Sequence, residues 1–490
     1  MGPLRQEGLP HRRRPEGAGP TLGDVAPLGR GSHVAFTNRA SRRLGTWGGG
    51  ATRRRLAPIL WTAAVTASLA VPWWFVLRLE LAHAQGSWRF LSLVASTTAA
   101  SLLVAAVVLP SRVRAITSHL GVERILRQHR LLAVVAALLV AAHVVFVVLH
   151  DPQGLGVLDL RDAPPRVWAA TVATVALAGQ VLLAVSRRSR GRRYERWRLT
   201  HVVLANVLMA TAALHVLWLR DLTAYGPARW WLGALGAVMV AVTAYRWAWR
   251  PLRAQRRAYV VGEVRGGPGA TLVVLHARGH GGIPFRPGQF AWLKVGDSAF
   301  VFEEHPFTIA STATEPWRKE FAVKPLGDFT QVLAGLSPGQ RVYLDGPHGT
   351  FTLDGLRSSA FVFIAGGVGV TPMLSMLRTM AARGDRRPAV LVVAGRTADD
   401  LLHRADHEHL DARLDLHVVE VLEEPPQDWR GEVGWLTEAV LRGALPVRRA
   451  AGRVDYFVCG PGPMVAATVH MLQELEVGPA RIHTELFDVV

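Results

Sequence analysis

Two pairs of histidines with the same spacing lie in apolar stretches of this chain. The members of each pair are 14 residues apart: His129 with His143, and His201 with His215. At about 100° per residue, this spacing is just under four helical turns, so both members face one side of a helix, roughly 21 Å apart along its axis. Two such helices, parallel and side by side, would present two stacked histidine pairs, and neutral imidazole is a usual axial ligand of haem iron. The pattern predicts two haems with these four histidines as metal ligands.

A plainer interpretation is that a polar side chain in a membrane helix only bonds a neighbouring helix. Ionisable side chains inside a membrane are costly, however, and are found mainly where they have a function. Four histidines with matched spacing on two separate stretches therefore favour the haem interpretation.

The histidines lie on or next to the third and fifth of six apolar stretches, at residues 57–79, 88–110, 130–150, 167–186, 200–219 and 229–248. Each has about the 20 residues that span a hydrocarbon core. Arginines crowd the tail, the second and fourth connections and the segment after the last stretch. The positive-inside rule therefore predicts a multi-pass protein of the bacterial inner (plasma) membrane with both termini in the cytoplasm. On this topology His129 pairs with His201 at the inner level, and His143 pairs with His215 at the outer level.

The composition narrows the class of protein further. The formal net charge of +19 over 490 residues would ordinarily suggest nucleic acid, but the arginines gather at the ends of apolar stretches, so we expect membrane lipid and no nucleic acid as a partner. Cys459 is the only cysteine, which excludes a disulfide framework and a cysteine-ligated iron–sulfur cluster. Residues 1–56 are rich in Arg, Gly and Pro, which is typical of a disordered tail.

A different pattern begins near residue 258, where short β-rich runs alternate with Gly and Pro turns, as in a small antiparallel barrel. The runs are 258–264, 271–277, 289–294, 321–323 and 340–344. The clusters between them suit a flavin: they offer hydroxyls near a ring, glycine backbone that approaches a phosphate, and a lysine that neutralises charge. The predicted FAD-binding residues are His305, Pro306, Phe307, Thr308, Ile309, Ser311, Lys324, Gly327 and Thr330.

Strands alternate with helices in the last part of the chain, which predicts a parallel sheet with its ligand at the carboxyl ends of the strands. The strand 361–365 runs into a glycine turn and then a helix at 373–383, a phosphate cradle at a helix N-terminus. Further strands are expected at 389–394 and 456–459. The predicted nucleotide-binding residues are Gly366, Gly367, Gly369, Thr371, Pro372, Arg396, Cys459, Gly460 and Pro461.

Two of these nucleotide-binding residues carry more specific expectations. Arg396 lies where a 2′-phosphate would be met, which favours NADPH over NADH, with contact to ribose or to a neighbouring carboxylate as the alternative. Cys459 ends a buried strand at the crevice. We expect it to contact nicotinamide rather than to act as a nucleophile, because a hydride passes directly to flavin.

The chain resembles a known superfamily over nearly its whole length beyond the tail. The six stretches with their histidines, and the run from Tyr194 to His201, are similar to the transmembrane domain that ferric reductases and NADPH oxidases share. The segments HPFTIAST, GDFT and GPHGTF resemble the flavin domain of the ferredoxin–NADP reductase family, and AGGVGVTP and CGPGPM resemble its nucleotide domain.

The resemblance implies that an aromatic residue near the C-terminus covers the flavin ring and yields to nicotinamide. Phe487 is that residue here, although three residues follow it. Animal-type NADPH oxidases also carry a histidine one turn beyond the outer ligand of the third span, where this chain has Val147. The expectation of dedicated superoxide production is therefore weaker than that of the electron path.

Together these patterns predict a bacterial-type multidomain membrane protein. It would contain a disordered basic tail (1–56), a six-helix haem-binding transmembrane bundle (57–250), an antiparallel β-barrel for FAD (256–354) and an α/β parallel-sheet domain for NADPH or NADH (358–490). The expected function is electron transfer from cytoplasmic NAD(P)H through FAD and two b-type haems to an outer acceptor, ferric iron or oxygen. The alternative is a membrane electron-donor subunit that serves a quinone or a partner protein. The expected catalytic residues are Thr308, Cys459 and Phe487.

Overall fold

The computed structural model describes residues 50–83, 86–113, 121–151, 161, 163–186, 194–219, 223–267, 269–402, 404–445 and 453–486. Residues from 53 onward form one compact unit. Most of the predicted tail lies outside the described residues, and helix α1 (Gly50–His83) begins within its last part. The predicted boundaries of the domains stay predictions.

Long helices make up the first half of the described chain. They are α2 (Ser87–Val108, continued by a 3₁₀ turn at Leu109–Ser111), α4 (Val122–His150), α5 (Pro165–Ser186), α6 (Tyr194–Trp218) and α8 (Gly226–Ala244). A π-helical turn at Tyr245–Trp249 joins α8 to α9 (Arg250–Arg256). Within the described residues, five helices are long and apolar enough to cross a membrane. The predicted first span lies in α1, which is not among them, so the count of six spans stays a prediction.

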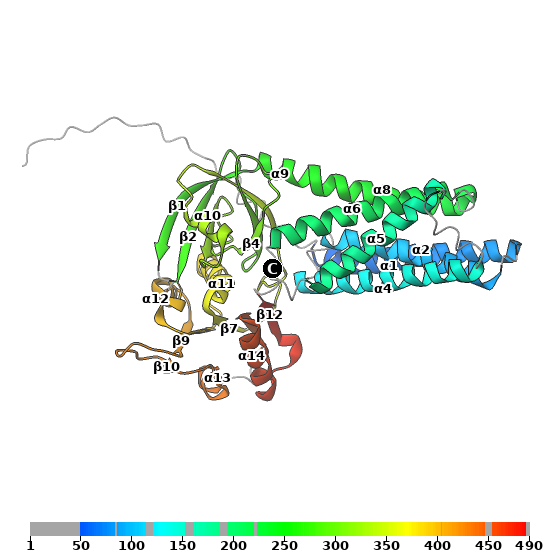
Figure 1. The fold of residues 1–490 in the computed structure, drawn as a ribbon. Coiled ribbons are helices and arrows are strands. Elements are labelled where there is room, and N and C mark those ends of the chain that lie inside the picture. Colours follow the sequence, from blue (N-terminus) through cyan, green and yellow to red (C-terminus); the bar gives the residue numbers. More distant parts are fainter. Residues whose placement is uncertain are drawn as a thin grey trace, which may run out of the picture. The chain divides into compact units, whose positions relative to one another are not determined.

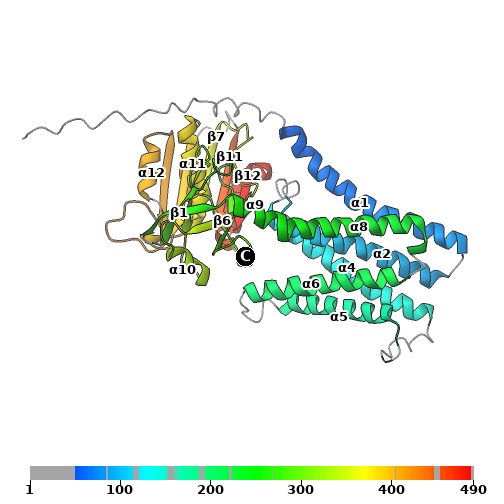
Figure 2. The ribbon, with the colours of Figure 1, turned by 90° about the horizontal axis from the view of Figure 1, so that it is seen from above.

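The helices pack in pairs, α2 along α4 and α5 along α6 (Figure 2). Many Leu and Val side chains stay exposed, such as Leu138 on α4 and Leu182 on α5. Exposed tryptophans lie near the starts of α2, α5 and α8 and at the end of α6: Trp88, Trp168, Trp230 and Trp218. Because successive helices run in opposite directions, these tryptophans fall at one end of the bundle, as in the aromatic belt at a membrane surface.

An antiparallel sheet of six strands follows the helices. The strands are β1 (Tyr259–Gly267), β2 (Ala270–Ala277), β3 (Phe290–Val295), β4 (His305–Thr308), β5 (Arg318–Val323) and β6 (Arg341–His348), in the order β4-β3-β6-β1-β2-β5. Strands β1, β2 and β4 are labelled in Figure 1. The Ala310 N–H donates to the Glu320 carbonyl and so connects the residues after β4 to β5, at the opposite edge. The antiparallel sheet is confirmed, and its closure into a barrel stays a prediction.

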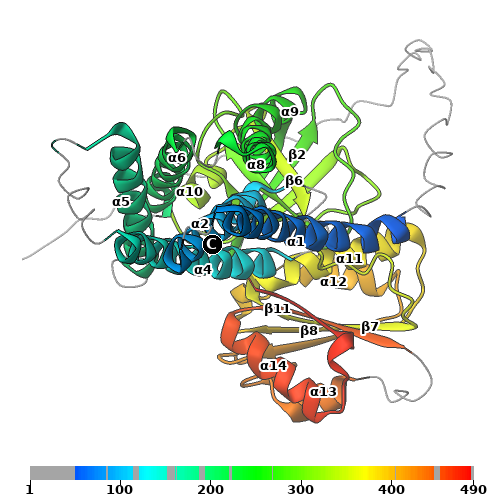
Figure 3. The ribbon, with the colours of Figure 1, turned by 90° about the vertical axis from the view of Figure 1, so that its right-hand side faces the viewer.

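A second sheet has six parallel strands in the order β10-β9-β8-β7-β11-β12. They are β7 (Ala360–Gly366), β8 (Ala389–Gly395), β9 (Leu416–Leu422), β10 (Glu432–Val433), β11 (Val454–Gly460) and β12 (Ile482–Leu486). Helices α11 (Val370–Arg383) and α12 (Arg404–Asp411) cover one face, and α13 (Glu438–Ala444) and α14 (Gly462–Glu474) cover the other (Figure 3). The predicted parallel α/β sheet is confirmed, although its strands β9, β10 and β12 were not predicted.

Candidate cofactor sites

The four histidines lie on two helices and come together in two pairs. Helix α4 carries His129 and His143, and α6 carries His201 and His215. The ring centroids of His129 and His201 are 6.1 Å apart at an interplanar angle of 74°. His143 and His215 are electrostatic neighbours. The structure thus brings together the same pairs that the predicted topology requires.

Three of the four rings are held by backbone carbonyls of a neighbouring helix. The Nδ1 of His129 lies 2.8 Å from the Ala106 carbonyl oxygen, and that of His215 lies 2.8 Å from the Arg166 oxygen. The Nδ1 of His143 meets the Ser92 oxygen at 3.1 Å and the Ser92 hydroxyl at 2.9 Å. An Nδ1–H that donates to a carbonyl leaves Nε2 with its lone pair, which is the arrangement of a metal-ligating histidine.

The surroundings of the inner pair contain residues that sequence reasoning missed. The indole of Trp197 stacks on His201, with ring centroids 5.3 Å apart. Arg246, in the π-helical turn, interacts electrostatically with both His129 and His201. The sequence did carry a signal for Arg246, because it is a charged residue inside a predicted membrane span, where charge usually marks function.

A cavity of about 1340 Å³ lies between the antiparallel sheet and the first turns of α4 and α6. Among the residues predicted to bind FAD, those that line it are His305, Pro306, Phe307, Thr308, Lys324, Gly327 and Thr330. Arg124 and Arg127 of α4, and Glu195 and Arg196 of α6, also line it and were not predicted. These four residues reach the cavity only because α4 and α6 lie against the antiparallel sheet, and a motif of neighbouring residues cannot predict a contact between parts so far apart in sequence.

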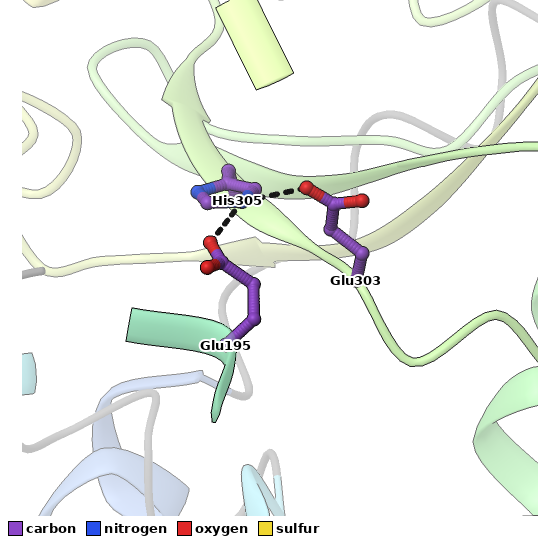
Figure 4. A group of neighbouring side chains, drawn as sticks. All are labelled: Glu195, Glu303 and His305. Carbon is purple, nitrogen blue, oxygen red and sulfur yellow. Dashed lines mark ion pairs between the residues drawn. The ribbon is translucent and has the colours of Figure 1, made fainter. Parts of the chain in front are cut away.

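Figure 4 shows how Glu195 of α6 meets His305 of β4. The His305 ring lies between two carboxylates, with its Nε2 3.6 Å from Glu195 of α6 and 3.6 Å from Glu303. The ring also packs 4.4 Å from that of Phe329, measured between centroids. His305 therefore links the wall of the cavity to a membrane helix.

The remaining flavin-motif residues have other surroundings. Ile309 is buried in the core of the sheet, and the Ser311 hydroxyl donates to the Arg318 carbonyl 3.2 Å away. The Thr330 hydroxyl accepts from the N–H groups of Leu326 and Gly327 at 3.0 Å each, so it caps the short helix α10 (Asp328–Ala334). Next to it, a Cβ at Gly327 would meet no heavy atom within 4 Å, which leaves that backbone open to a ligand.

The glycine turn after β7 is open at Gly367 and closely packed at Gly369. Gly367 has φ +52°, and a Cβ there would meet nothing within 4 Å. A Cβ at Gly369 would stand 2.3 Å from the Cys459 carbonyl oxygen, so only glycine lets this turn approach the end of β11. Gly366 and Gly460 meet at the same place, and Pro372 is buried in the first turn of α11. Thr371 also lines the cavity of about 1340 Å³ described above, so the turn and the cavity are continuous.

The other predicted nucleotide-site residues are placed as follows. Arg396 is exposed, and its guanidinium pairs with Glu424 at 2.9 Å, which is the neighbouring carboxylate considered above. Cys459 is fully buried, and burial together with the charge of Glu485 raises the pKa of its thiol, so the sulfur stays protonated. Pro461 precedes α14 at its N-terminus. Phe487 lies outside the described residues.

Comparison with known families accounts for three successive parts of the chain. A model described as a ferric reductase like transmembrane component matches residues 95–212. An FAD-binding domain matches residues 263–352, and an oxidoreductase NAD-binding domain matches residues 363–470. These matches confirm the resemblance that the sequence motifs indicated.

Individual relatives cover only part of the chain. An NADH-cytochrome b5 reductase 1 of Pyricularia oryzae is 34% identical over 38% of this chain and 61% of its own length. A flavohemoprotein of Deinococcus radiodurans is 32% identical over 49% of this chain and 60% of its own length. The chain therefore spans about three fifths of these relatives.

One solved structure to which the chain is similar is the FAD/NAD-binding domain of a nitric oxide dioxygenase from Vibrio cholerae. It has 23% identity and a TM-score of 0.42, and it covers 47% of this chain and 98% of the other. This chain thus matches, in order, a ferric-reductase-like transmembrane component, an FAD-binding domain and an oxidoreductase NAD-binding domain.

Proposed function

We propose that this protein transfers electrons from NAD(P)H, through FAD and two bis-histidine haems held by α4 and α6, to an acceptor on the other side of the membrane. The observation that carries the proposal is the pairing of four imidazoles on two membrane helices, three of them with Nδ1 held by a backbone carbonyl. Helices that only needed to pack would not require four ligand-type side chains in two levels.

The donor set fits the haems. The Nε2 atoms of His129, His143 and His215 are left for a metal, because their Nδ1 atoms are occupied. His201 has a buried Nδ1 with no hydrogen-bond partner among the described residues, and Trp197 fixes the plane of its ring. Arg246 provides a positive charge beside the inner pair, suited to the carboxylate edge of a haem.

The cavity residues fit a flavin and a nicotinamide nucleotide. Lys324 and the open backbone of Gly327 suit a pyrophosphate, and the Gly367 turn suits the phosphates of a nucleotide. A bound flavin supplies the conversion of a two-electron hydride into single electrons, and bound haems supply one-electron carriage. The cavity is lined by α4 residues that lie near His129 rather than His143, so the His129–His201 level is the one that receives electrons first. We place this level on the cytoplasmic side, as the arginine distribution predicts.

The first test is an anaerobic visible spectrum of the purified protein before and after addition of NADPH or NADH. Split b-type haem bands on reduction are the expected result. The His143→Ala variant should lose one of the two haems and reduction of an external acceptor, while NAD(P)H-driven reduction of a soluble dye persists. His150→Ala, at the exposed end of the same helix, is the matched control. Absence of haem from the wild-type protein, or full-rate external reduction in His143→Ala, would contradict the proposal.

The acceptor defines two versions of this function. In the first, ferric iron or oxygen takes electrons at the edge of the outer haem, since two histidine ligands leave no open position on the iron. In the second, the protein donates to a quinone or a partner protein. One observation supports donation to a partner protein. A relative from Rhodococcus jostii, 35% identical over 39% of this chain, is the reductase component of a propane 2-monooxygenase. If electron transfer to an acceptor requires a co-expressed partner protein, the second version of the function is the correct one.

A further inference from the structure

A three-residue segment of the antiparallel sheet domain, Phe302–Glu304, is held by the ends of the membrane helices. The Phe302 ring stacks on Trp247 of the π-helical turn, with centroids 6.2 Å apart at 12°. The Arg198 guanidinium of α6 lies 4.6 Å from the same ring and donates to the Phe302 carbonyl at 3.3 Å. Phe302 is thus held between an aromatic ring and a cation from two different helices.

Glu304 is the buried acidic residue of this segment and is only 3% exposed. Its carboxylate lies 2.5 Å from Arg198 of α6, 2.9 Å from Arg112 after α2, and 3.9 Å from Arg250 of α9. Lys294 of β3 adds a fourth cation at 3.6 Å. Burial alone would raise the pKa of Glu304, but these four cations lower it to about 2, so the carboxylate is ionised throughout the neutral range.

Asp345 of β6 repeats the arrangement with two of the same arginines. Arg112 binds it at 2.9 Å, and Arg250 also forms an ion pair with it. Arg112 has left-handed backbone angles, φ 59° and ψ 32°, which cost energy for a residue with a side chain and persist only where the surroundings impose them. Its guanidinium lies 3.6 Å from the centre of the Trp292 ring of β3. The strained backbone is therefore fixed by contacts with the sheet.

We propose that the Phe302–Glu304 segment, with Asp345, is a docking latch that fixes the flavin-binding sheet to the cytoplasmic ends of α2, α6 and α9. The segment runs directly into β4, whose residues His305–Thr308 line the flavin cavity. The latch therefore sets the position of the flavin relative to the inner histidine pair. Glu304 is a positioning residue, and this role rests on the proposed function.

A buried ion pair is suited to fixing geometry rather than to adding stability. The cost of taking charges out of water offsets much of their attraction, but removal of one partner leaves buried charge without compensation. In Glu304→Gln the carboxylate beside Arg198 and Lys294 is lost, and Arg112 and Arg250 keep only Asp345, so the sheet would no longer be held in one position. A longer path between the flavin and the inner histidine pair slows electron transfer, because the rate falls exponentially with the distance between donor and acceptor.

The kinetic test compares two steps in Glu304→Gln by anaerobic stopped flow. We expect the rate of flavin reduction by NAD(P)H and its KM to stay at the wild-type values, and the rate of haem reduction to fall severalfold or more. Glu304→Asp, which keeps the charge, should recover part of the rate. The matched control is Asp354→Asn, because Asp354 pairs with Arg383 at 2.6 Å and touches none of the latch residues. Asp345→Asn provides a second variant if Glu304→Gln does not fold.

A second readout needs no electron transfer. The chain has one cysteine, and because Cys459 is fully buried, spin labels can be placed at Val185→Cys on α5 and Arg341→Cys on β6, both exposed. The distance distribution should be narrow in the otherwise unchanged chain and in Asp354→Asn, and broad or shifted in Glu304→Gln. Equal distributions and equal haem reduction rates in all variants would overturn the latch and leave the proposed function standing. If no variant shows nicotinamide-driven haem reduction, the proposed function fails, and the label distances alone decide the latch.

Discussion

Buried polar side chains have different partners in the membrane helices and in the two sheets. In the helices, polar side chains bond backbone carbonyls: Thr97 donates to Leu93 at 2.7 Å, and Ser101 donates to Ser68 of α1 at 2.6 Å. In the sheets, buried charges meet opposite charges, as Glu320 meets Arg378 at 2.6 Å. A hydrocarbon environment supplies neither water nor counter-ions, so the backbone is the available partner there. Carbonyl bonding of Nδ1 leaves His129, His143 and His215 with Nε2 available for a ligand, whereas an ion pair occupies both charged groups.

The largest effect is expected when one histidine of the inner pair on the membrane helices is removed. On the proposed function, His201→Ala removes a ligand of the inner haem, and NAD(P)H-driven reduction of the outer haem and of an external acceptor should disappear completely. Dithionite should still reduce the outer haem, because its ligands His143 and His215 are untouched. An anaerobic spectrum with each reductant in turn measures this. Persistence of NAD(P)H-driven haem reduction would show that the two levels do not act in series.

Neutralisation of a buried carboxylate tests how much the buried ion pairs of the sheets contribute to stability. Glu320 of β5 pairs with Arg378 of α11 and with Arg318 of β5, and it is 5% exposed. In Glu320→Gln Arg318 loses its charge partner and Arg378 keeps only Asp406, and breaking such a buried pair costs about 3 kcal/mol of unfolding free energy. Glu438→Gln, which breaks the exposed pair with Arg442, should cost less than about 1 kcal/mol. Denaturant unfolding followed by flavin fluorescence measures both, and equal costs would contradict the distinction.

Lys319 is an exception among the buried charges of the sheets. Its ammonium donates to the Pro316 carbonyl at 3.0 Å and lies 3.9 Å from the Phe285 ring, and burial lowers its pKa from 10.5 to about 7. Between these two values the unfolded chain binds a proton that the folded chain does not. The free energy of unfolding should therefore rise as pH increases from about 7 to about 10.5, and the Lys319 contribution should be lost as pH falls through that window.

Lys319→Met removes this titration and supplies the control. The variant should be more stable than the wild type at pH 7 and should show a flatter dependence of unfolding free energy on pH above 7. Thermal or denaturant unfolding at pH 7, 8 and 9 measures the two slopes. Equal slopes in both proteins would mean that Lys319 finds a charge partner in solution.

The smallest expected effect concerns a single hydroxyl beside the outer pair. Ser92→Ala removes the hydroxyl 2.9 Å from the His143 Nδ1 and keeps the Ser92 carbonyl at 3.1 Å. A lost hydrogen bond of this kind is worth about 1 kcal/mol, so the midpoint potential of the outer haem should move by no more than about 60 mV. Ser96→Ala, on the same helix, removes only a bond to the Leu93 carbonyl and should leave the potential unchanged. A potentiometric titration compares the two variants.

Periodicity and motif order were enough to predict the histidine pairs and the order of the two sheets. A spacing of 14 residues places His129 and His143 on one helix face whatever surrounds them, and the glycine turn after β7 follows from the strand and helix on either side of it. Strand β4 was not predicted, because its sequence begins with His305 and Pro306 and lacks the alternation of a strand. It becomes a strand only by pairing with β3.

Other parts of the candidate sites depend on contacts that the sequence does not show. Glu195 meets His305 across 110 positions of chain, and Arg198 meets Glu304 across 106. The sequence places Arg198 three residues before His201, where it could equally pair a haem propionate or be an ordinary arginine at the end of a span, and only the fold shows its carboxylate partner Glu304. Helix α6 could be predicted from hydrophobicity, but the residues that its first turn contributes to the flavin cavity could not.

The order of the latch residues along the chain has a consequence for biosynthesis. Arg112, Arg198 and Arg250 all precede the carboxylates of Glu304 and Asp345 that neutralise them. A ribosome therefore delivers three uncompensated positive charges, at the ends of membrane helices, before it has made their partners. Such charges are what the insertion machinery uses to orient a span. The same arginines would first direct the insertion of the helices and later bind the carboxylates of the folded flavin domain. A mutation that removes the charge of any of them would therefore impair both the orientation of the membrane helices and the docking of that domain.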